Sequence, residues 1–332
     1  MKLWLIVCIS ALSIGGCQRK SFGMADGADA IHINRFDSAL YRWIDIDDSI
    51  SLQQVKDEYP QMLDLLGKAL FKASYTDTSA FYDNLINYFS EPTLKSLYKD
   101  AIIYYSGDSA STQLICKELA YGFERMKELF LTAKIPAIYF HVSGLQQNFI
   151  IADSLLSCSI DKYLGADYQL YNDFFYDYQK KNMTPAQLPK DCFEVWLKSE
   201  FPFQGKDNIL LDRMIYEGKI IYSLTKISKE YTLQNILSLS DAEFRWCIEY
   251  EKPLWTTIIE RKHLYTPDAA TTTKYFLPSP STFIAAEAPG DLGYFIGYRI
   301  VECYMKQTKS SCEELMKNAD SQDILTKSKY KP

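Results

Sequence analysis

Two short β-type runs set between long helical patterns are the feature that most constrains the fold. The runs IPAIYFHVSG (135–144) and QNFIIADSLLSCSID (147–161) are rich in β-branched and aromatic residues, and GLQQ lies where they meet. We interpret them as two strands of a small antiparallel sheet joined at this turn, with Ile31 and Ile33 predicting a further strand. Because the flanking sequence follows helical spacing, the predicted fold class is α+β and predominantly helical.

Helical spacing of apolar residues dominates residues 49–131. Pro60 interrupts the first part, so the pattern predicts two helices that meet there. Pro92, preceded by an acidic residue, predicts the start of another helix. The longest pattern, from 111 to 130, predicts a helix with one buried stripe. The stripe consists of Leu114, Ile115, Leu119, Phe123, Met126 and Phe130.

The first residues, MKLWLIVCISALSIGGC, combine one lysine, an apolar run and then small residues. The run is too short to span a membrane and is typical of a secretory signal peptide, predicted at 1–16. SIGGC resembles the lipobox of bacterial lipoproteins, which implies cleavage before Cys17 and its modification by acyl chains such as palmitate. The alternative is a plain signal peptide with a chance cysteine. Residues 17–28 then form a tether, and 29–332 form a single mainly helical α+β domain.

Charge and cysteine content narrow the class of protein. The net charge of −6 gives no basic surface for phosphate, so we expect no nucleic-acid partner. The 25 tyrosines fit packing at the edge of the core, or a surface that binds glycan or peptide. Six cysteines follow Cys17, with 15 possible pairings and no C-x-x-C pair, and we expect mostly buried free thiols. They are Cys116, Cys158, Cys192, Cys247, Cys303 and Cys312.

The common catalytic motifs are missing. His32, His141 and His263 lie far apart in the sequence, so there is no H-E-x-x-H pair of zinc ligands. HVSG (141–144) lacks the glycine that a nucleophile elbow requires, and no Walker loop or G-x-G-x-x-G occurs. We therefore expect no metal and no cofactor, although paired carboxylates, which have no fixed spacing, stay open as catalysts.

Glu217 is the acidic residue that most needs an explanation. In LLDRMIYEGKIIYSL (210–224) it falls on the apolar face of a predicted helix. A buried carboxylate needs a cation, a hydrogen-bond donor or a metal. Three possibilities stay open: an exposed pair with Arg213, a buried structural network, or a catalytic or metal-binding role. Gly218 beside it would let another element approach closely, at some cost in helix stability.

Several long blocks resemble one family, the gliding motility-associated lipoprotein GldB family of Bacteroidota. The blocks are the lipobox, INRFD (33–37), IDKYLGADYQLY (160–171), MIYEGKIIY (214–222), PGDLGYFIGYRIVECYM (289–305) and ILTKSKYKP (324–332). The resemblance covers nearly all of the mature chain and implies a role in gliding or an associated secretion apparatus. Gln18 after the lipidated cysteine implies sorting to the outer membrane, with the domain facing the periplasm.

The helix at 210–224 also resembles, more weakly, the third-ligand helix of gluzincin metallopeptidases. Glu217, Gly218 and Tyr222 match its E-G-x-x-x-Y pattern, but the segment where H-E-x-x-H should stand, 189–201, has no histidine. This resemblance implies a zincin-like scaffold without metal chemistry.

In that scaffold Glu217 is a relic ligand, paired with Arg299 or with a tyrosine such as Tyr298. The sequence thus predicts a non-catalytic envelope lipoprotein that contacts other envelope proteins. The alternatives are a peptide or glycan hydrolase that uses Glu217, and a glycan or lipid binder that uses its tyrosines.

Overall fold

The computed structural model describes residues 31–46, 49–72, 78–152, 154–278 and 280–332. The strands are β1 (Ile33–Asn34), β2 (Ala137–His141), β3 (Phe149–Ala152) and β4 (Leu155–Ser159). The α-helices are α1 (Phe36–Ile46), α2 (Ser49–Glu58), α3 (Pro60–Phe71), α4 (Thr78–Ser90), α5 (Pro92–Tyr104), α6 (Ala110–Leu129), α7 (Asp177–Lys180), α8 (Leu188–Glu200), α9 (Leu210–Ile227), α10 (Leu233–Ile236), α11 (Asp241–Glu249), α12 (Glu251–Glu260), α13 (Ala269–Lys274), α14 (Leu292–Thr308), α15 (Cys312–Lys317) and α16 (Ser321–Ser328). Three 3-10 helices, η1 (Ile160–Lys162), η2 (Gln169–Asp173) and η3 (Pro185–Gln187), complete these elements.

The sheet is mixed, and this corrects the expected antiparallel sheet. Among the described residues its strand order is β1-β2-β4-β3. β1 and β4 both run parallel to β2, with Ile138 opposite Leu156, and only β3 and β4 form an antiparallel pair. The second β-type run is therefore a hairpin rather than one strand, and GLQQ does not join paired strands. The α+β class with mostly helical content is confirmed.

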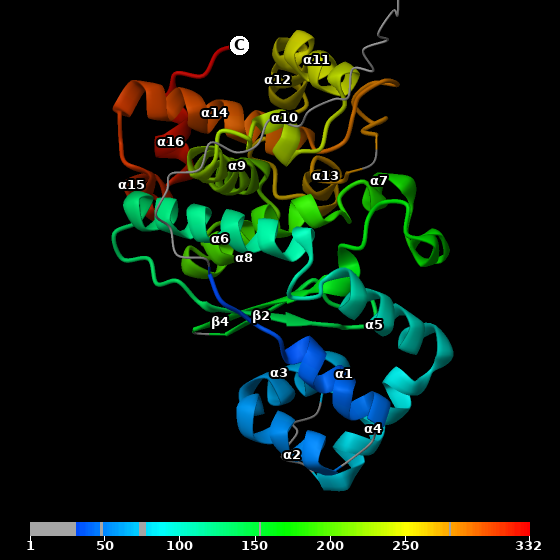
Figure 1. Cartoon of the computed structure of the whole chain (residues 1–332). Coiled ribbons are helices and arrows are strands. Elements are labelled where there is room, and N and C mark those ends of the chain that lie inside the picture. Colours follow the sequence, from blue (N-terminus) through cyan, green and yellow to red (C-terminus); the bar gives the residue numbers. More distant parts are fainter. Residues whose placement is uncertain (1–30, 47–48, 73–77, 153, 279) are drawn as a thin grey trace, which may run out of the picture.

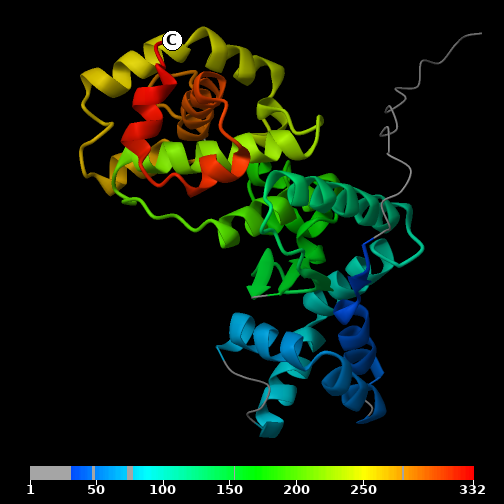
Figure 2. The same cartoon turned by 90° about the vertical axis from the view of Figure 1, so that its left-hand side faces the viewer.

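The sheet lies between two groups of helices (Figure 1, Figure 2). α1–α4 lie on one side, and α6 and α8 lie on the other. α9, α14 and α16 lie beyond α8, further from the sheet. β4 is buried at all five positions, as expected for a central strand covered on both faces.

The N-terminal helices begin and end where the prolines and the apolar spacing of the sequence predict. α2 ends at Glu58 and α3 begins at Pro60, so two helices do meet at this proline. α5 begins at Pro92, and the Glu91 side chain accepts a hydrogen bond from the backbone NH of Leu94 at 2.9 Å. α6 buries the predicted stripe except Leu114, which is 53% exposed. Leu114 directly precedes the buried Ile115 and points away from the core.

Two glycines set the contact between α9 and α14. A Cβ atom on Gly218 would lie 2.3 Å from the backbone of Gly297, and a Cβ atom on Gly297 would lie 1.9 Å from the carbonyl oxygen of Met214. The two helix backbones therefore touch directly, which only glycine at both positions permits. The close approach expected at Gly218 is confirmed.

Many tyrosines join the core through their rings and bond backbone oxygens through their hydroxyls. The Tyr98 hydroxyl donates to the Asp37 carbonyl at 2.9 Å, and the Tyr171 hydroxyl donates to the Asp161 carbonyl at 2.5 Å. Both rings are fully buried. These contacts agree with the interpretation of tyrosine as a packing residue with a polar end.

The predictions for the N-terminus lie outside the described residues. They comprise the signal peptide at 1–16, lipidated Cys17 and the tether at 17–28. Among the described residues, no helix has the length and apolar character needed to cross a membrane. The six cysteines after Cys17 are free thiols in the structure, and four of them are buried. Most of these cysteines are therefore buried, as the sequence predicts.

Replacing Gly297 with alanine is expected to destabilise the protein. The added methyl group would overlap the Met214 carbonyl oxygen, so α9 and α14 must separate. We expect the free energy of unfolding to fall by about 1–3 kcal/mol, as for other overpacked core sites. Urea unfolding followed by circular dichroism measures this change. Gly107→Ala is the matched control, because a Cβ atom there meets nothing within 4 Å. An equal stability of both variants would contradict the close contact.

Candidate functional site

Glu217 faces α8 and forms an ion pair with Lys198. The Lys198 Nζ lies 3.1 Å from Glu217 Oε2 and 2.9 Å from Glu194 Oε1. Glu194 and Lys198 are four residues apart on α8, so they share one helix face. Only 13% of the Glu217 side chain is exposed. Of the three possibilities from the sequence, the geometry matches the buried structural network.

The charges in this cluster are unequally stabilised. Burial raises the pKa of Glu217, and Lys198 offsets that effect only in part. For Glu194 burial acts in the same direction, but Lys198 and Lys190 together hold its pKa below the usual value. Burial lowers the pKa of Lys198, but the two carboxylates outweigh it and raise that pKa. Lys198 is therefore shared by both carboxylates, and Glu194 has Lys190 as a second cation at 3.9 Å.

A cavity of about 240 Å³ opens beside this cluster. Its lining combines the two glutamates with Asp291, Tyr294 and Asn182, and with the apolar residues Ile220, Ile221, Ile236, Leu237, Phe276 and Pro278. Asp291 precedes α14 in a left-handed backbone conformation with φ of 60°, and burial raises its pKa to about 6. The cavity thus has an acidic part and an apolar wall.

The other residues of the predicted relic site lie elsewhere on α9 and α14. The pairing of Glu217 with Arg299 is wrong, because Arg299 Nε donates to Glu251 at 2.9 Å and its Nη1 donates to Glu302 at 2.8 Å. Tyr298 is also bound to Glu302, by a 3.4 Å hydrogen bond from its hydroxyl. The Tyr222 and Tyr298 rings are neighbours, with centroids 6.3 Å apart.

Arg213 does not form the alternative exposed pair either. Its guanidinium stacks over the Phe276 ring at 4.4 Å. Tyr294, one turn before Tyr298, is the tyrosine that lines the cavity with Glu217. Sequence reasoning missed Glu194 and Lys198, although their spacing of four residues in a helical pattern is a signal for an ion pair.

The Arg299 cluster instead holds the C-terminal segment. The Tyr330 hydroxyl donates to Glu251 Oε1 at 2.9 Å, and the same oxygen accepts from Arg299 Nε. Tyr330 and Glu251 are both buried. The block at 324–332 that carries part of the family resemblance is therefore anchored to α12 and α14 by a charged network.

The histidine and serine residues of HVSG belong to two separate buried polar groups. His141 Nδ1 lies 2.8 Å from Ser157 Oγ, and its Nε2 has no hydrogen-bond partner within the described part of the chain. Ser159 Oγ lies 2.8 Å from Ser143 Oγ and donates to Asp161 at 2.5 Å, and Asp161 also accepts hydrogen bonds from the backbone NH groups of Ser143 and Leu145. These side chains are fully buried where β2 and β4 end, so no substrate reaches them. The Asp161 group fixes the loop after β2, and His141 contacts neither Ser143 nor Asp161, so no Ser-His-Asp nucleophile is formed.

A second cavity of about 310 Å³ is lined by the buried Lys219. The Lys219 ammonium donates to the carbonyl oxygens of Met316 and Asn318 at 3.3 and 3.0 Å. Burial lowers its pKa to about 8. Both acceptors lie at the C-terminal end of α15, where carbonyl groups attract a cation. This lysine ties α9 to the C-terminal helices.

The residues that the structure describes contain no group of three or more His, Cys, Asp or Glu side chains placed to hold a metal. No histidine is among the residues that line the cavity at Glu217. The two glutamates of the cavity lining are already paired with the Lys198 ammonium. As it stands, this arrangement can bind a polar or basic group, but it lacks an assembled metal-ligand set.

Lys198→Met is expected to destabilise the protein more at neutral pH than in acid. Without the ammonium, Glu194 and Glu217 repel each other, and the pKa of Glu217, which burial already raises, rises further. The cost of keeping both carboxylates charged is larger at neutral pH than in acid, and at pH 7 we expect a loss of about 1–3 kcal/mol in the free energy of unfolding. The loss shrinks as the pH falls through the raised pKa of Glu217. Lys306→Met is the control, because its 3.1 Å pair with Glu302 is exposed. An equal loss at pH 7 and pH 4.5 would reject this electrostatic explanation.

Asp291→Asn is expected to stabilise the protein above pH 6. The folded pKa of about 6 exceeds the usual 3.8, so the ionised form is disfavoured in the fold, and wild-type stability falls as the pH rises between these values. Asparagine carries no charge and tolerates the left-handed conformation. We expect a gain of about 1–2 kcal/mol at pH 7.5 and no gain below pH 4, measured by urea unfolding. A gain that is independent of pH would exclude charge burial as the cause.

The comparisons with known proteins identify one family. The family described as gliding motility protein GldB matches residues 24–332, which is nearly the whole chain, and its short name denotes a lipoprotein. No curated protein matches the chain. No solved structure matches it either, so the gluzincin resemblance stays a prediction. The chain belongs to the gliding motility protein GldB family.

Proposed function

We propose that the protein is a non-catalytic outer-membrane lipoprotein, anchored through Cys17, whose domain faces the periplasm and acts by contact with other envelope proteins. The observation that carries the non-catalytic part is the position of Lys198 between Glu194 and Glu217. In a hydrolase with two catalytic carboxylates, the space between them receives the scissile bond or the attacking water. Here the Lys198 ammonium lies between the two carboxylates and contacts one oxygen of each.

The same ion pair argues against a catalytic metal at Glu217. A zinc enzyme uses three protein ligands and leaves one position open. Glu217 is already paired, and the positive charge of Lys198 repels a divalent cation. The two carboxylates therefore serve the packing of α8 against α9.

An exposed aromatic segment supports a role in protein contacts. Phe174 is 61% exposed and Tyr176 is 72% exposed, in the segment between η2 and α7. The Tyr176 ring stacks on the Tyr178 ring at 5.7 Å. α7 lies at the edge of the molecule (Figure 1). Large exposed aromatic side chains are enriched at protein interfaces.

The alternative is a peptide or glycan hydrolase that uses Glu217. The cavity of about 240 Å³ beside the two carboxylates favours it, because a substrate group could enter there. In this alternative, Lys198 must move away from Glu217 when substrate binds. Metal analysis of the purified domain addresses the zinc version, and stoichiometric zinc would replace our proposal by this alternative.

Complementation separates the two functions. In cells lacking the protein, the neutral triple variant Glu194→Gln, Lys198→Met, Glu217→Gln is expected to restore the phenotype fully. The measured phenotype is the spreading of colonies on a surface. In a host that does not glide, it is the resistance of the cells to detergent. Phe174→Ser with Tyr176→Ser is expected to restore it poorly while keeping the wild-type melting temperature, because both side chains are exposed. The matched control is Ile50→Ser, which removes an exposed apolar side chain elsewhere. A folded triple variant without function would establish a catalytic role instead.

A further inference from the structure

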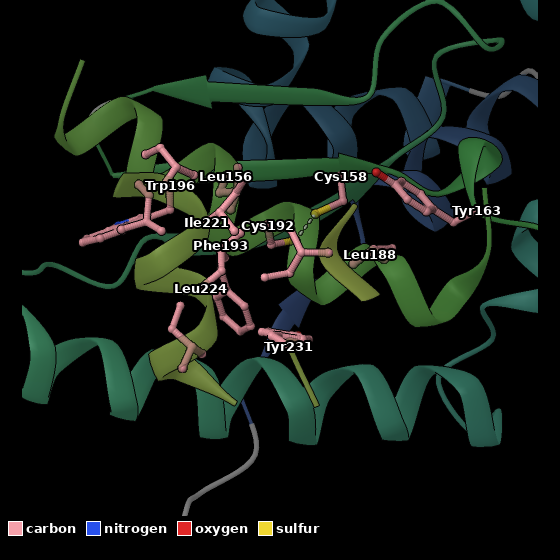
Figure 3. Packing of buried hydrophobic residues seen from close by; sticks show 14 of the residues in the cluster. Leu156, Cys158, Tyr163, Leu188, Cys192, Phe193, Trp196, Ile221, Leu224 and Tyr231 are labelled. Atoms are coloured by element: carbon pink, nitrogen blue, oxygen red, sulfur yellow. Dashed lines mark hydrogen bonds between the residues drawn. The ribbon is translucent and has the colours of Figure 1, made fainter. Parts of the chain in front are cut away.

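Two cysteine sulfurs from different elements lie in contact in the core. Cys158 is in β4 and Cys192 is in α8, and their Sγ atoms are 3.1 Å apart (Figure 3). Both residues are fully buried. Nonbonded heavy atoms usually pack at roughly 3.5–4.0 Å, and the sulfurs of a disulfide are about 2.05 Å apart. A shift of about 1 Å would therefore bring these two atoms to bonding distance.

The local sequence explains why the two sulfurs meet. β4 is buried on both faces, so the Cys158 side chain packs against the element that covers its face of the sheet. On α8, Leu188, Cys192 and Trp196 follow a spacing of four residues and are all buried. Figure 3 shows Cys158 and Cys192 pointing toward one another between strand and helix. The contact is set by the packing of α8 on the sheet.

We propose that Cys158 and Cys192 are joined by a disulfide bond in the exported protein. The two thiols lose two protons and two electrons as the S–S bond forms. A disulfide of an envelope thiol oxidant accepts them and is reduced to two thiols. The bacterial envelope outside the inner membrane permits such bonds. The proposal rests on export of the chain and is independent of whether the protein is catalytic.

Burial determines when this bond forms. A bulky oxidant has no access to two fully buried sulfurs, so oxidation precedes the closure of α8 on the sheet. Burial also raises the pKa of Cys192, which leaves little thiolate for exchange in the folded chain. Once formed, the bond is shielded from external reductants for the same reason. The chain therefore acquires a permanent link and not a switch that responds to the medium.

The link would constrain the most irregular part of the chain. The two cysteines are 34 positions apart, and the segment between them contains η1, η2, α7 and η3. It also contains the exposed Phe174 and Tyr176. Closing this loop lowers the entropy of the unfolded chain and fixes both ends of the segment on the core.

Thiol mapping tests the bond directly. The full chain, exported and purified without reductant, is denatured in guanidinium with iodoacetamide and analysed by mass spectrometry. The expected result is alkylation of Cys116, Cys247, Cys303 and Cys312 only, together with one linked peptide pair containing Cys158 and Cys192. After reduction all six should be alkylated, as in a chain made in the reducing cytoplasm. Alkylation of Cys158 and Cys192 without reduction, or a link to another cysteine, overturns the proposal.

A second measurement does not depend on proteolysis. Exported wild-type protein that is unfolded and refolded with reductant is expected to melt about 5 °C or more below the oxidised protein. Cys158→Ala with Cys192→Ala should show no effect of reductant. Cys116→Ala is the matched control and should respond like the wild type, because Cys116 has no part in the link. Equal melting temperatures of oxidised and reduced wild type would contradict a stabilising disulfide.

Discussion

The direct backbone contact between α9 and α14 is the constraint on which the C-terminal half depends. Gly218 and Gly297 each occupy a position where any side chain would overlap the other helix. This contact sets the distance between the α9 and α14 axes, and therefore how deeply the residues beside Gly218 are buried. Glu217 on one side meets α8, and Lys219 on the other meets the end of α15. The two charged residues that flank Gly218 can be largely buried there because each has partners on a different neighbouring helix.

The pairing at Glu217 shows how a carboxylate on an apolar helix face is accommodated without a metal. A single lysine ammonium contacts two carboxylates, and all three side chains are only partly shielded from water. Burial still raises the pKa of Glu217, so the compensation is incomplete. The arrangement therefore contributes more to the orientation of α8 on α9 than to net stability. A role in orientation fits a protein that presents a fixed surface.

Local patterns predicted helices well and long-range pairing poorly. Pro60 and Pro92 marked helix boundaries because proline acts through its own backbone, which the sequence shows directly. The direction of β2 relative to β4 depends on how the chain returns to the sheet, and two adjacent β-type runs do not encode it. β3 and β4 are separated by only two residues in the sequence, so the pattern does not distinguish their antiparallel pair from one continuous strand.

The candidate site was predicted in part, for a related reason. Helical periodicity placed Glu217 on a buried face, and Gly218 indicated a close contact, since both follow from a single helix. The partner of Glu217 depends on which of several cations the fold brings near it. The sequence predicts Arg299 as this partner because it lies in a block that resembles the family. In the structure, Arg299 lies on a part of α14 that faces α12. Lys198 required knowledge of the packing of α8 on α9.

α8 connects the sheet to the C-terminal helices through three separate contacts along its length. Near its start, Cys192 contacts Cys158 of β4. Next to it, Phe193 fills the space over Gly122 of α6, where a Cβ atom would lie 2.0 Å from the ring. Near its end, Lys198 reaches α9. Only the ion pair depends on salt and pH, because the sulfur contact and the ring on Gly122 carry no charge. A change of salt or pH therefore weakens one attachment of α8 and leaves the packing of the other two.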